Sequence, residues 1–324
     1  MASSRWRPDP DGPWRLSRRD ALGSAMALGL LGSRAAAADD ALPVIEVAPG
    51  IFVFHGAHEE ATAANLGGIA NLGFIVGGEA VAVVDTGGSA AEGRRLLAAI
   101  RQRTALPVRY AIDTHFHPDH ALGNSAFTGP DTTIVGHANL PRGLAARAGT
   151  YLNGLRGALG DAAAGTEIVL PTLLVRERLS LDLGGRMLEL RAWPPAHTDS
   201  DLTVLDTATG TLFAGDLVFL ERVPAIDGSL RGWLDVIAGL RQVTGVTRVV
   251  PGHGPVSASW PGALDDEERY LRLILTETRA ALAAGRSLDQ AVATVGRSER
   301  GRWLLFDDYN DRNVATAYTE LEWE

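Results

Sequence analysis

The order of secondary-structure signals along the chain constrains its fold more than any other feature. Gly-punctuated runs rich in β-branched and aromatic residues alternate with runs whose apolar residues recur at helical spacing. The strand-like runs gather in two blocks, and each block is followed by a helix. This order predicts two sheets packed face to face with helices on their outer faces, which is an α/β (α+β) fold of four αββα layers.

The first block contains three strand-like runs, at residues 50–56, 71–88 and 108–115. A helix is predicted over residues 90–104, because Leu96, Leu97 and Ile100 share one face and charged residues occupy the other.

The second block begins with two predicted hairpins, one turning at Gly184 and Gly185 and the other near Thr209 and Gly210. A helix over 230–245 and a strand over 247–254 follow. The tail from Ala263 onward has mostly helical patterning, and we expect it to pack on the same core. Residues 39–324 are therefore predicted to form one domain, C-terminal helices included.

Residues 1–38 differ in character from the rest of the chain. The pair Arg18 and Arg19 precedes an apolar stretch, Ala21 to Leu31, which is followed by small residues. This layout is typical of a twin-arginine signal peptide cleaved near Ala38, and it predicts export to the periplasm. The alternatives are an uncleaved anchor and a soluble N-terminal helix. The apolar stretch is shorter than the roughly 20 residues that cross a bilayer.

Charge and cysteine content exclude several classes of function. The 324 residues carry a formal net charge of -9, which argues against a grip on nucleic acid. The chain has no cysteine, so disulfides, thiolate metal ligands and a cysteine nucleophile are excluded. Any metal must therefore be held by His, Asp or Glu.

The stretch THFHPDH, residues 114–120, follows a predicted strand and is dense in metal-ligating residues. His115 and His117 project to the same side of an extended chain. The chain turns after Pro118, so that Asp119 and His120 can point to a second, adjacent position. Imidazole and carboxylate ligands suit zinc, with iron or manganese as competitors. The alternative is a set of surface or core histidines without a metal.

Two full metal shells need further ligands from other loops. Three residues that follow predicted strands qualify: His197 in WPPAHTDSD, Asp216 in LFAGDLV and His253 in VVPGHGP. Glycine stands beside Asp216 and on both sides of His253, where it lets the backbone approach a crowded site. Alone, Asp216 fits a turn and His253 fits an ordinary loop.

These motifs together resemble those of the metallo-β-lactamase-fold hydrolases, with Asp85 of VVDTGG as the early strand-end aspartate and HFHPDH as the HxHxDH signature. The resemblance implies a metallo-β-lactamase sandwich that holds two Zn²⁺ ions per chain. It assigns His115, His117 and His197 to one metal, Asp119, His120 and His253 to the other, and Asp216 to a bridge.

The chemistry expected of such a centre is hydrolysis. Two zinc ions about 3.5–4 Å apart polarise a carbonyl or phosphoryl oxygen and lower the pKa of a shared water towards about 7, and that hydroxide would be the nucleophile. Asp119 would also orient the water or shuttle a proton. Asp85 is expected to orient a ligand, with direct binding to metal as the alternative. Asp113 and Thr114 are expected either to hydrogen-bond ligand imidazoles or to cap the strand end.

The two other histidines of interest are His58, which either contacts substrate or lies exposed on a loop, and His137, for which we expect a structural role.

Longer stretches point to one branch of this family. The chain has Asp216 where one lactamase branch has cysteine, and HTDSD where glyoxalase II-like enzymes continue differently. PAHTDSDL and GDLVFLERVPAIDGSLRGWL resemble the quinoprotein relay system zinc metallohydrolases, in the sulfur-oxidation-associated hydrolase-like branch. This resemblance implies a periplasmic hydrolase of an ester, thioester, lactone or amide-type bond in a small molecule. It also implies association with PQQ-dependent quinoprotein dehydrogenases, without nucleic acid and without a membrane span in the mature form.

Two other classes of function stay open on the sequence alone. One is a mononuclear iron, sulfur-dioxygenase-like oxidoreductase on the same scaffold. The other is a non-catalytic quinoprotein accessory. Within the hydrolase interpretation, turnover of β-lactams calls for a basic group at the pocket rim, for which Arg222 is the candidate.

Overall fold

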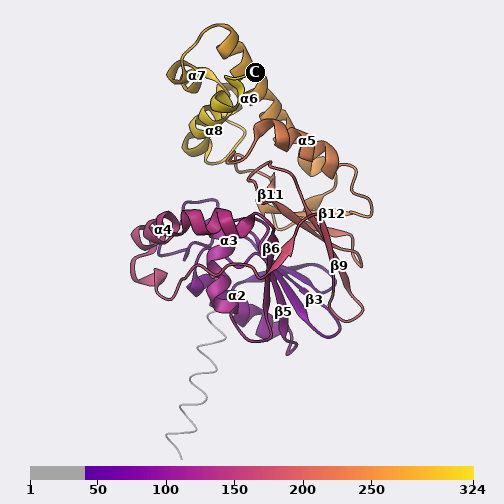
Figure 1. The fold of residues 1–324 in the computed structure, drawn as a ribbon. Helices are drawn as coiled ribbons and strands as arrows, with labels where there is room; N and C mark the ends of the chain where they lie inside the picture. Colours follow the sequence, from indigo (N-terminus) through magenta and orange to yellow (C-terminus); the bar gives the residue numbers. More distant parts are fainter. Residues whose placement is uncertain (1–40) are drawn as a thin grey trace, which may run out of the picture. The chain divides into compact units, whose positions relative to one another are not determined.

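The computed structural model describes residues 41–324, so the predicted signal peptide lies outside the described residues. Two mixed β-sheets lie face to face at the centre of this part of the chain (Figure 1). The first sheet has seven strands in sequence order. They are β1 (Val44–Ala48), β2 (Ile51–Phe54), β3 (Leu72–Val76), β4 (Val81–Val84), β5 (Val108–Ile112), β6 (Thr133–His137) and β7 (Leu173–Val175).

The second sheet has six strands in the order β13-β12-β11-β10-β9-β8. They are β8 (Arg178–Asp182), β9 (Met187–Ala192), β10 (Leu202–Asp206), β11 (Thr211–Phe219), β12 (Arg248–His253) and β13 (Ala258–Ser259). Pairing of β8 with β9 and of β10 with β11 confirms both predicted hairpins. The parallel pairing of β11 with β12 places the ends of these two strands at the same edge.

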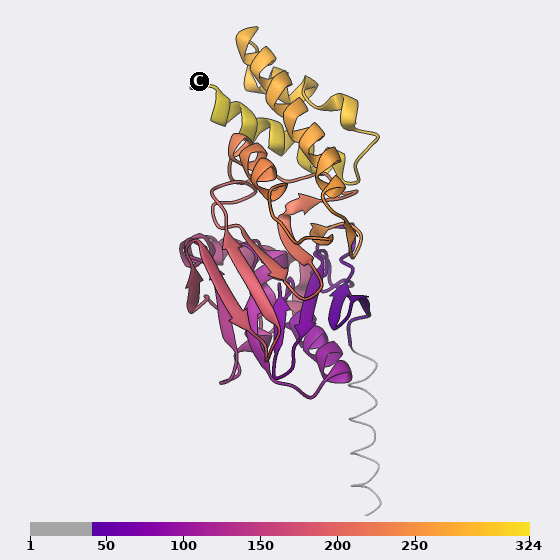
Figure 2. The ribbon, with the colours of Figure 1, turned by 90° about the vertical axis from the view of Figure 1, so that its right-hand side faces the viewer.

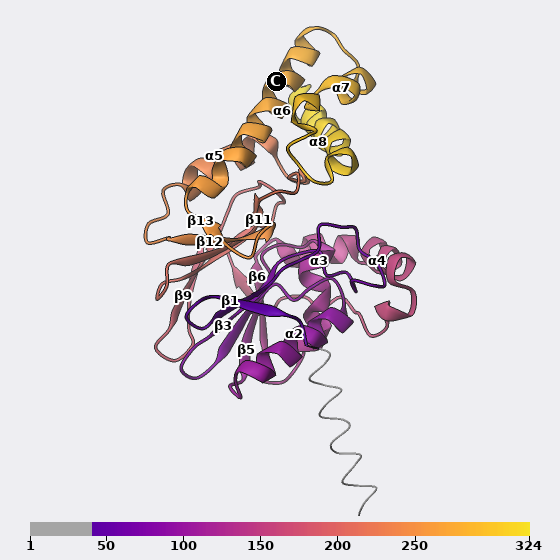
Figure 3. The ribbon, with the colours of Figure 1, turned by 180° about the vertical axis from the view of Figure 1, so that it is seen from behind.

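The predicted helices form and lie outside the sheets (Figure 3). The α-helices are α2 (Ala90–Arg103), α3 (Pro118–Ala121), α4 (Leu140–Leu159), α5 (Leu230–Leu240), α6 (Asp265–Ala283), α7 (Leu288–Thr294) and α8 (Phe306–Leu321). Short 3₁₀ helices cover Leu122–Phe127, Gly160–Ala163, Gly262–Leu264 and Arg297–Glu299. Ser89 caps α2 by accepting a hydrogen bond from the Glu92 backbone N–H, as expected of a helix that starts after a turn.

One hydrophobic core fills the space between the sheets, and a second lies outside the second sheet. Ile51 and Ile112 of the first sheet belong to the same buried cluster as Leu190 and Phe213 of the second. The other core packs α5, α6 and α8 on the outer face of β11 and β12 (Figure 2). The C-terminal helices therefore pack against the outer face of the second sheet, and the fold has the four αββα layers that the sequence predicts.

Helix α4 is the main element that the sequence patterns do not predict. Its twenty residues include four glycines, and only five of its residues are buried. Sparse apolar residues give a weak helical period, so tertiary contacts decide the structure here. Among residues 41–324, no helix is long and apolar enough to cross a membrane.

Candidate metal centre

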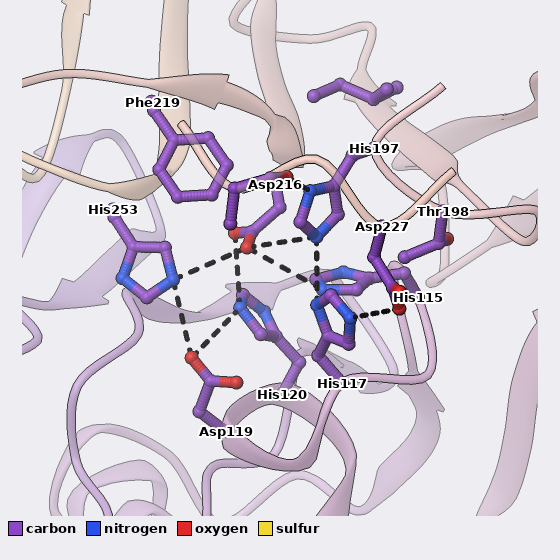
Figure 4. Close-up of polar contacts among 12 residues, drawn as sticks. His115, His117, Asp119, His120, His197, Thr198, Asp216, Phe219, Asp227 and His253 are labelled. Carbon is purple, nitrogen blue, oxygen red and sulfur yellow. Dashed lines mark hydrogen bonds and ion pairs between the residues drawn. The ribbon is translucent and has the colours of Figure 1, made fainter. Parts of the chain in front are cut away.

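The seven predicted ligands converge at one edge of the two sheets. His115, His117, His197 and Asp216 form one group whose donor atoms all lie within 4.8 Å of one another, and Asp119, His120 and His253 form a second such group. Figure 4 shows both groups around Asp216. These are the two sets that the family resemblance assigns to two metals. Most of these side chains are buried, which suits ligands more than surface histidines.

The loop after β5 supplies four of the seven side chains, and its proline explains how. His117 has an extended backbone, with φ -66° and ψ 149°, as the residue before a proline favours. Pro118 then begins the single turn of α3, which carries Asp119 and His120. The change from extended chain to helical turn sends the two halves of HFHPDH to different groups.

Two glycines allow the strands to come this close. Gly215 has a φ of +52°, and a Cβ added there would lie 2.5 Å from Thr114 Oγ1. A Cβ added at Gly252 would overlap the Asp216 carboxylate. The glycines next to Asp216 and His253 therefore serve close approach, as the sequence predicts.

Asp216 stands between the two groups. Its Oδ2 lies 3.3 Å from His197 Nε2 and 3.4 Å from His253 Nε2, which belong to different groups. Its Oδ1 lies 3.2 Å from His120 Nε2. This placement fits the bridging role that the resemblance implies.

Each of the five histidines points one ring nitrogen towards the centre, and its other ring nitrogen donates a hydrogen bond to an acceptor outside the centre. The outer contacts are His115 Nδ1 to Thr114 Oγ1 (3.0 Å), His117 Nε2 to Asp227 Oδ2 (3.0 Å), His120 Nδ1 to Asp85 Oδ2 (2.8 Å), His197 Nδ1 to the Ala225 carbonyl (2.6 Å) and His253 Nδ1 to the Ile69 carbonyl (2.8 Å). With the outer nitrogen donating, the inner nitrogen presents a lone pair.

The residues present fit a metal. The inner nitrogens of His117 and His197 lie 2.9 Å apart, so two lone pairs face each other unless a cation lies near them. His115 Nε2, His120 Nε2 and Asp216 Oδ1 are buried without a hydrogen-bond partner. Buried polar atoms are rarely left without partners, and nitrogen and carboxylate donors are those that zinc prefers.

Asp85 lies outside the centre and supports a ligand from each group. Besides His120, it accepts hydrogen bonds from the Thr114 backbone N–H at 2.7 Å and from Thr114 Oγ1 at 2.8 Å, and Thr114 in turn holds His115. Asp85 has a φ of 58°, a strained conformation of the kind that clusters at functional sites. Asp113 makes no such contact with an imidazole and instead accepts a hydrogen bond from Asn124.

Burial and charge set the protonation of these groups. Burial holds the pKa of His115 well below its ordinary value, and it lowers the pKa of His197 to about 3, so both imidazoles are neutral. Burial also opposes charge on His120, but the nearby carboxylates, Asp216 foremost, outweigh it and raise the pKa, so a metal would displace a proton from its Nε2 on binding. Burial opposes charge on Asp119 as well, but His120 and His253 keep the pKa of this carboxyl below its usual range, so it stays ionised.

The sequence patterns did not indicate one residue that supports a ligand of the centre. Asp227, in the loop before α5, holds His117 and also lies 3.6 Å from the Arg147 guanidinium of α4. The only available signal was an Asp-Gly pair in AIDGSL, which is typical of an ordinary turn.

His58 and His137 lie outside the centre. His58 pairs with Glu221 at 3.3 Å, and His137 accepts a hydrogen bond from the Asn139 backbone N–H.

A cavity of about 360 Å³ opens over the centre. Helix α4 lines it with Tyr151, Leu155 and Ala158, and α8 lines it with Tyr309 and Arg312. Asp119, Asp216 and His253 also line the cavity. A small molecule in this space would therefore reach the centre.

Comparison with known proteins decides the family. The profile of the metallo-beta-lactamase superfamily matches residues 66–272. The chain belongs to this superfamily. The matched range contains all seven residues of the centre, so superfamily membership and donor set agree. Together they support a metal-dependent hydrolase that acts on a small molecule.

Individual relatives of the superfamily are distant. A linear primary-alkylsulfatase from Pseudomonas sp. (strain ATCC 19151) is 36% identical over 62 residues, which cover 19% of this chain and 12% of that protein. The sec-alkylsulfatase Pisa1 from Pseudomonas sp. superposes with a TM-score of 0.66 at 18% identity, over 86% of this chain and 50% of that one. A metallo-beta-lactamase from Pontibacter korlensis gives a TM-score of 0.56 at 20% identity, over 71% and 99%.

These structural likenesses establish the fold alone. The chain spans only a small part of the curated alkylsulfatase that it matches and about half of the Pisa1 chain. The quinoprotein relay branch has no counterpart among these relatives.

Proposed function

We propose that the chain is a dinuclear zinc hydrolase that cleaves an ester, thioester, lactone or amide-type bond of a small molecule. The observation that carries this proposal is the pair of donor groups that share Asp216 beneath an open cavity. When bound there, the metals would polarise the scissile bond and lower the pKa of a water. His115, His117 and His197 would hold one metal, Asp119, His120 and His253 the other, and Asp216 both.

Asp119 is the residue of the centre best placed to handle a proton. Its Oδ2 lies 3.3 Å from His253 Nε2 and 3.6 Å from His120 Nε2, while the carboxylate as a whole lines the cavity. Because the neighbouring imidazoles outweigh burial and keep its pKa below the usual range, Asp119 is ionised and can accept a hydrogen bond from water. It would orient that water towards substrate and pass the proton to the leaving group.

We further propose that the mature protein starts near Asp39 in the periplasm and works beside PQQ-dependent quinoprotein dehydrogenases. The support is the paired arginines before an apolar stretch and the resemblance of PAHTDSDL and GDLVFLERVPAIDGSLRGWL to the quinoprotein relay metallohydrolases. Fractionation of cells that express the full chain, with and without the Arg18 and Arg19 pair, tests the location. Export that is indifferent to the pair would count against it.

Cleavage of a sulfate ester is a second candidate. Its support is that the likeness to Pisa1 covers 86% of this chain, whereas the likeness to the Pontibacter korlensis metallo-beta-lactamase covers 71%.

The test of the proposed function is metal content followed by a substrate screen. The exported protein should bind two zinc ions per chain and hydrolyse at least one class in a panel of esters, thioesters, lactones, amides and alkyl sulfates. His120→Ala should abolish turnover, while His137→Gln, a matched change outside the centre, should not. One iron per chain with oxygen uptake, or turnover that survives His120→Ala, would refute the dinuclear hydrolase.

A further inference from the structure

The C-terminal helix α8 brings positive charge to the cavity over the metal centre. Tyr309 and Arg312 of α8 line this cavity together with Arg222, which follows β11. Tyr309 and Arg312 lie beyond residue 272, where the superfamily match ends. This wall of the cavity is therefore a feature of this chain that superfamily membership does not account for.

Arg222 is buried and lacks an anionic partner among residues 41–324. Only 4% of the residue is exposed. Its Nη2 donates to the Tyr309 hydroxyl at 2.7 Å, and its Nη1 lies 3.3 Å from His253 Nδ1. That nitrogen already donates its proton to the Ile69 carbonyl, so it cannot accept from Arg222. A buried guanidinium with an unused N–H beside a cavity is costly unless an anion binds there.

Arg312 places a second guanidinium on the same side. The guanidinium carbons of Arg222 and Arg312 lie 5.0 and 5.6 Å from the centre of the Tyr309 ring. Arg312 is exposed, and within the described part of the chain it has no carboxylate partner. The acidic group on this rim, Glu60, accepts a hydrogen bond from the Tyr309 hydroxyl at 2.8 Å. Arg222 and Arg312 thus place two guanidinium groups around the Tyr309 ring, and neither forms an ion pair with Glu60.

The opposite side of the cavity is apolar. Tyr151, Leu155 and Ala158 share one face of α4, and the spacing of three and four residues aligns them along the helix. Gly154 on the same face leaves open space, because an added Cβ would meet nothing within 4 Å. A ligand in this cavity therefore meets hydrocarbon on α4, positive charge on α8 and the metal donors Asp119, Asp216 and His253.

We propose that the substrate is an amphiphile with a carboxylate or similar anion remote from the scissile bond, and that Arg312 and Arg222 bind this anion beside Tyr309. This inference rests on the proposed hydrolase function and names its substrate class. The apolar part of the substrate lies on α4. Arg312 is a specificity-determining residue, since it would favour the anionic substrate over a neutral one of equal length.

A matched pair of esters tests the proposal. Mono-4-nitrophenyl adipate and 4-nitrophenyl hexanoate share the leaving group and chain length and differ in a terminal carboxylate. The zinc-loaded protein should prefer the adipate monoester in kcat/KM by about tenfold. Arg312→Gln should lower that ratio about fivefold, Arg312→Glu should lower it further, and Arg312→Lys should keep most of it. Arg300→Gln, whose arginine pairs with Asp307 away from the cavity, is the control.

A binding measurement separates this inference from the proposed function. Calorimetry should find that N-hexyladipamic acid binds the zinc-loaded protein more tightly than N-hexylhexanamide, and that Arg312→Gln removes most of the difference. If neither ester is cleaved, the hydrolase proposal fails on these substrates while the binding data still decide the anion site. A wild-type preference near one, or a preference that Arg312→Gln leaves unchanged because the carboxylate sits on the metals, would overturn the inference.

Discussion

Replacing Asp227 by alanine should weaken zinc binding at the three-histidine group without unfolding the protein. Asp227 Oδ2 accepts the proton of His117 Nε2 at 3.0 Å, which fixes the ring with Nδ1 towards the centre. Loss of such an outer contact costs about 10–100-fold in metal affinity. The Asp227 side chain is 43% exposed and also lies 3.6 Å from Arg147. We therefore expect a loss of zinc affinity at the lower end of this range, about tenfold, which corresponds to about 1.4 kcal/mol.

The assay is competition for zinc against a chromophoric chelator. Arg147→Gln should cost less than about threefold, and the double variant should be no weaker than Asp227→Ala alone, because Arg147 acts on His117 through Asp227. Asp235→Ala, on the exposed face of α5, is the control. A zinc affinity of Asp227→Ala within about twofold of wild type, or an equal loss in the control, would refute the orienting role.

Three further predictions concern stability. Gly157→Ala should stabilise the protein by about 0.5–1 kcal/mol in thermal unfolding, because the added Cβ would meet nothing within 4 Å. Gly143→Ala should destabilise it, because the added Cβ would lie 2.5 Å from the Phe116 ring. Equal shifts in Tm for the two variants would contradict this. Burial raises the pKa of Glu92 to about 8, so the native state keeps a proton that the unfolded state releases. Stability should therefore fall by up to about 1.4 kcal/mol per pH unit as pH rises from about 5 to about 8, a slope that Glu92→Gln should reduce; parallel urea titrations of both proteins check it. Removing zinc with a chelator should lower Tm. The free energy of unfolding should fall by about 2.7 kcal/mol relative to zinc at about 100 times its dissociation constant, and restoring zinc should reverse the loss.

The parts of the fold and site that the sequence predicts are those written in local patterns. Both hairpins carry turn residues between alternating runs, and HFHPDH carries four donors in six residues, so spacing alone places them. Asp227 and Arg312 carry no such pattern, since their roles come from chain segments that meet only after folding. The same reason explains why the role of Asp113 could not be predicted. Its position next to Thr114 suggests contact with a ligand imidazole, but its side chain accepts a hydrogen bond from Asn124.

The Asp85 carboxylate supports ligands of both metal groups at once. Its Oδ2 accepts a hydrogen bond from His120 Nδ1 and another from the Thr114 hydroxyl, which in turn contacts His115 Nδ1. In the proposed dinuclear centre, the two donor groups are consequently coupled through Asp85. A change at Asp85 that altered the basicity of an imidazole in one donor group would also alter an imidazole in the other, so the metal preferences of the two proposed positions are set jointly.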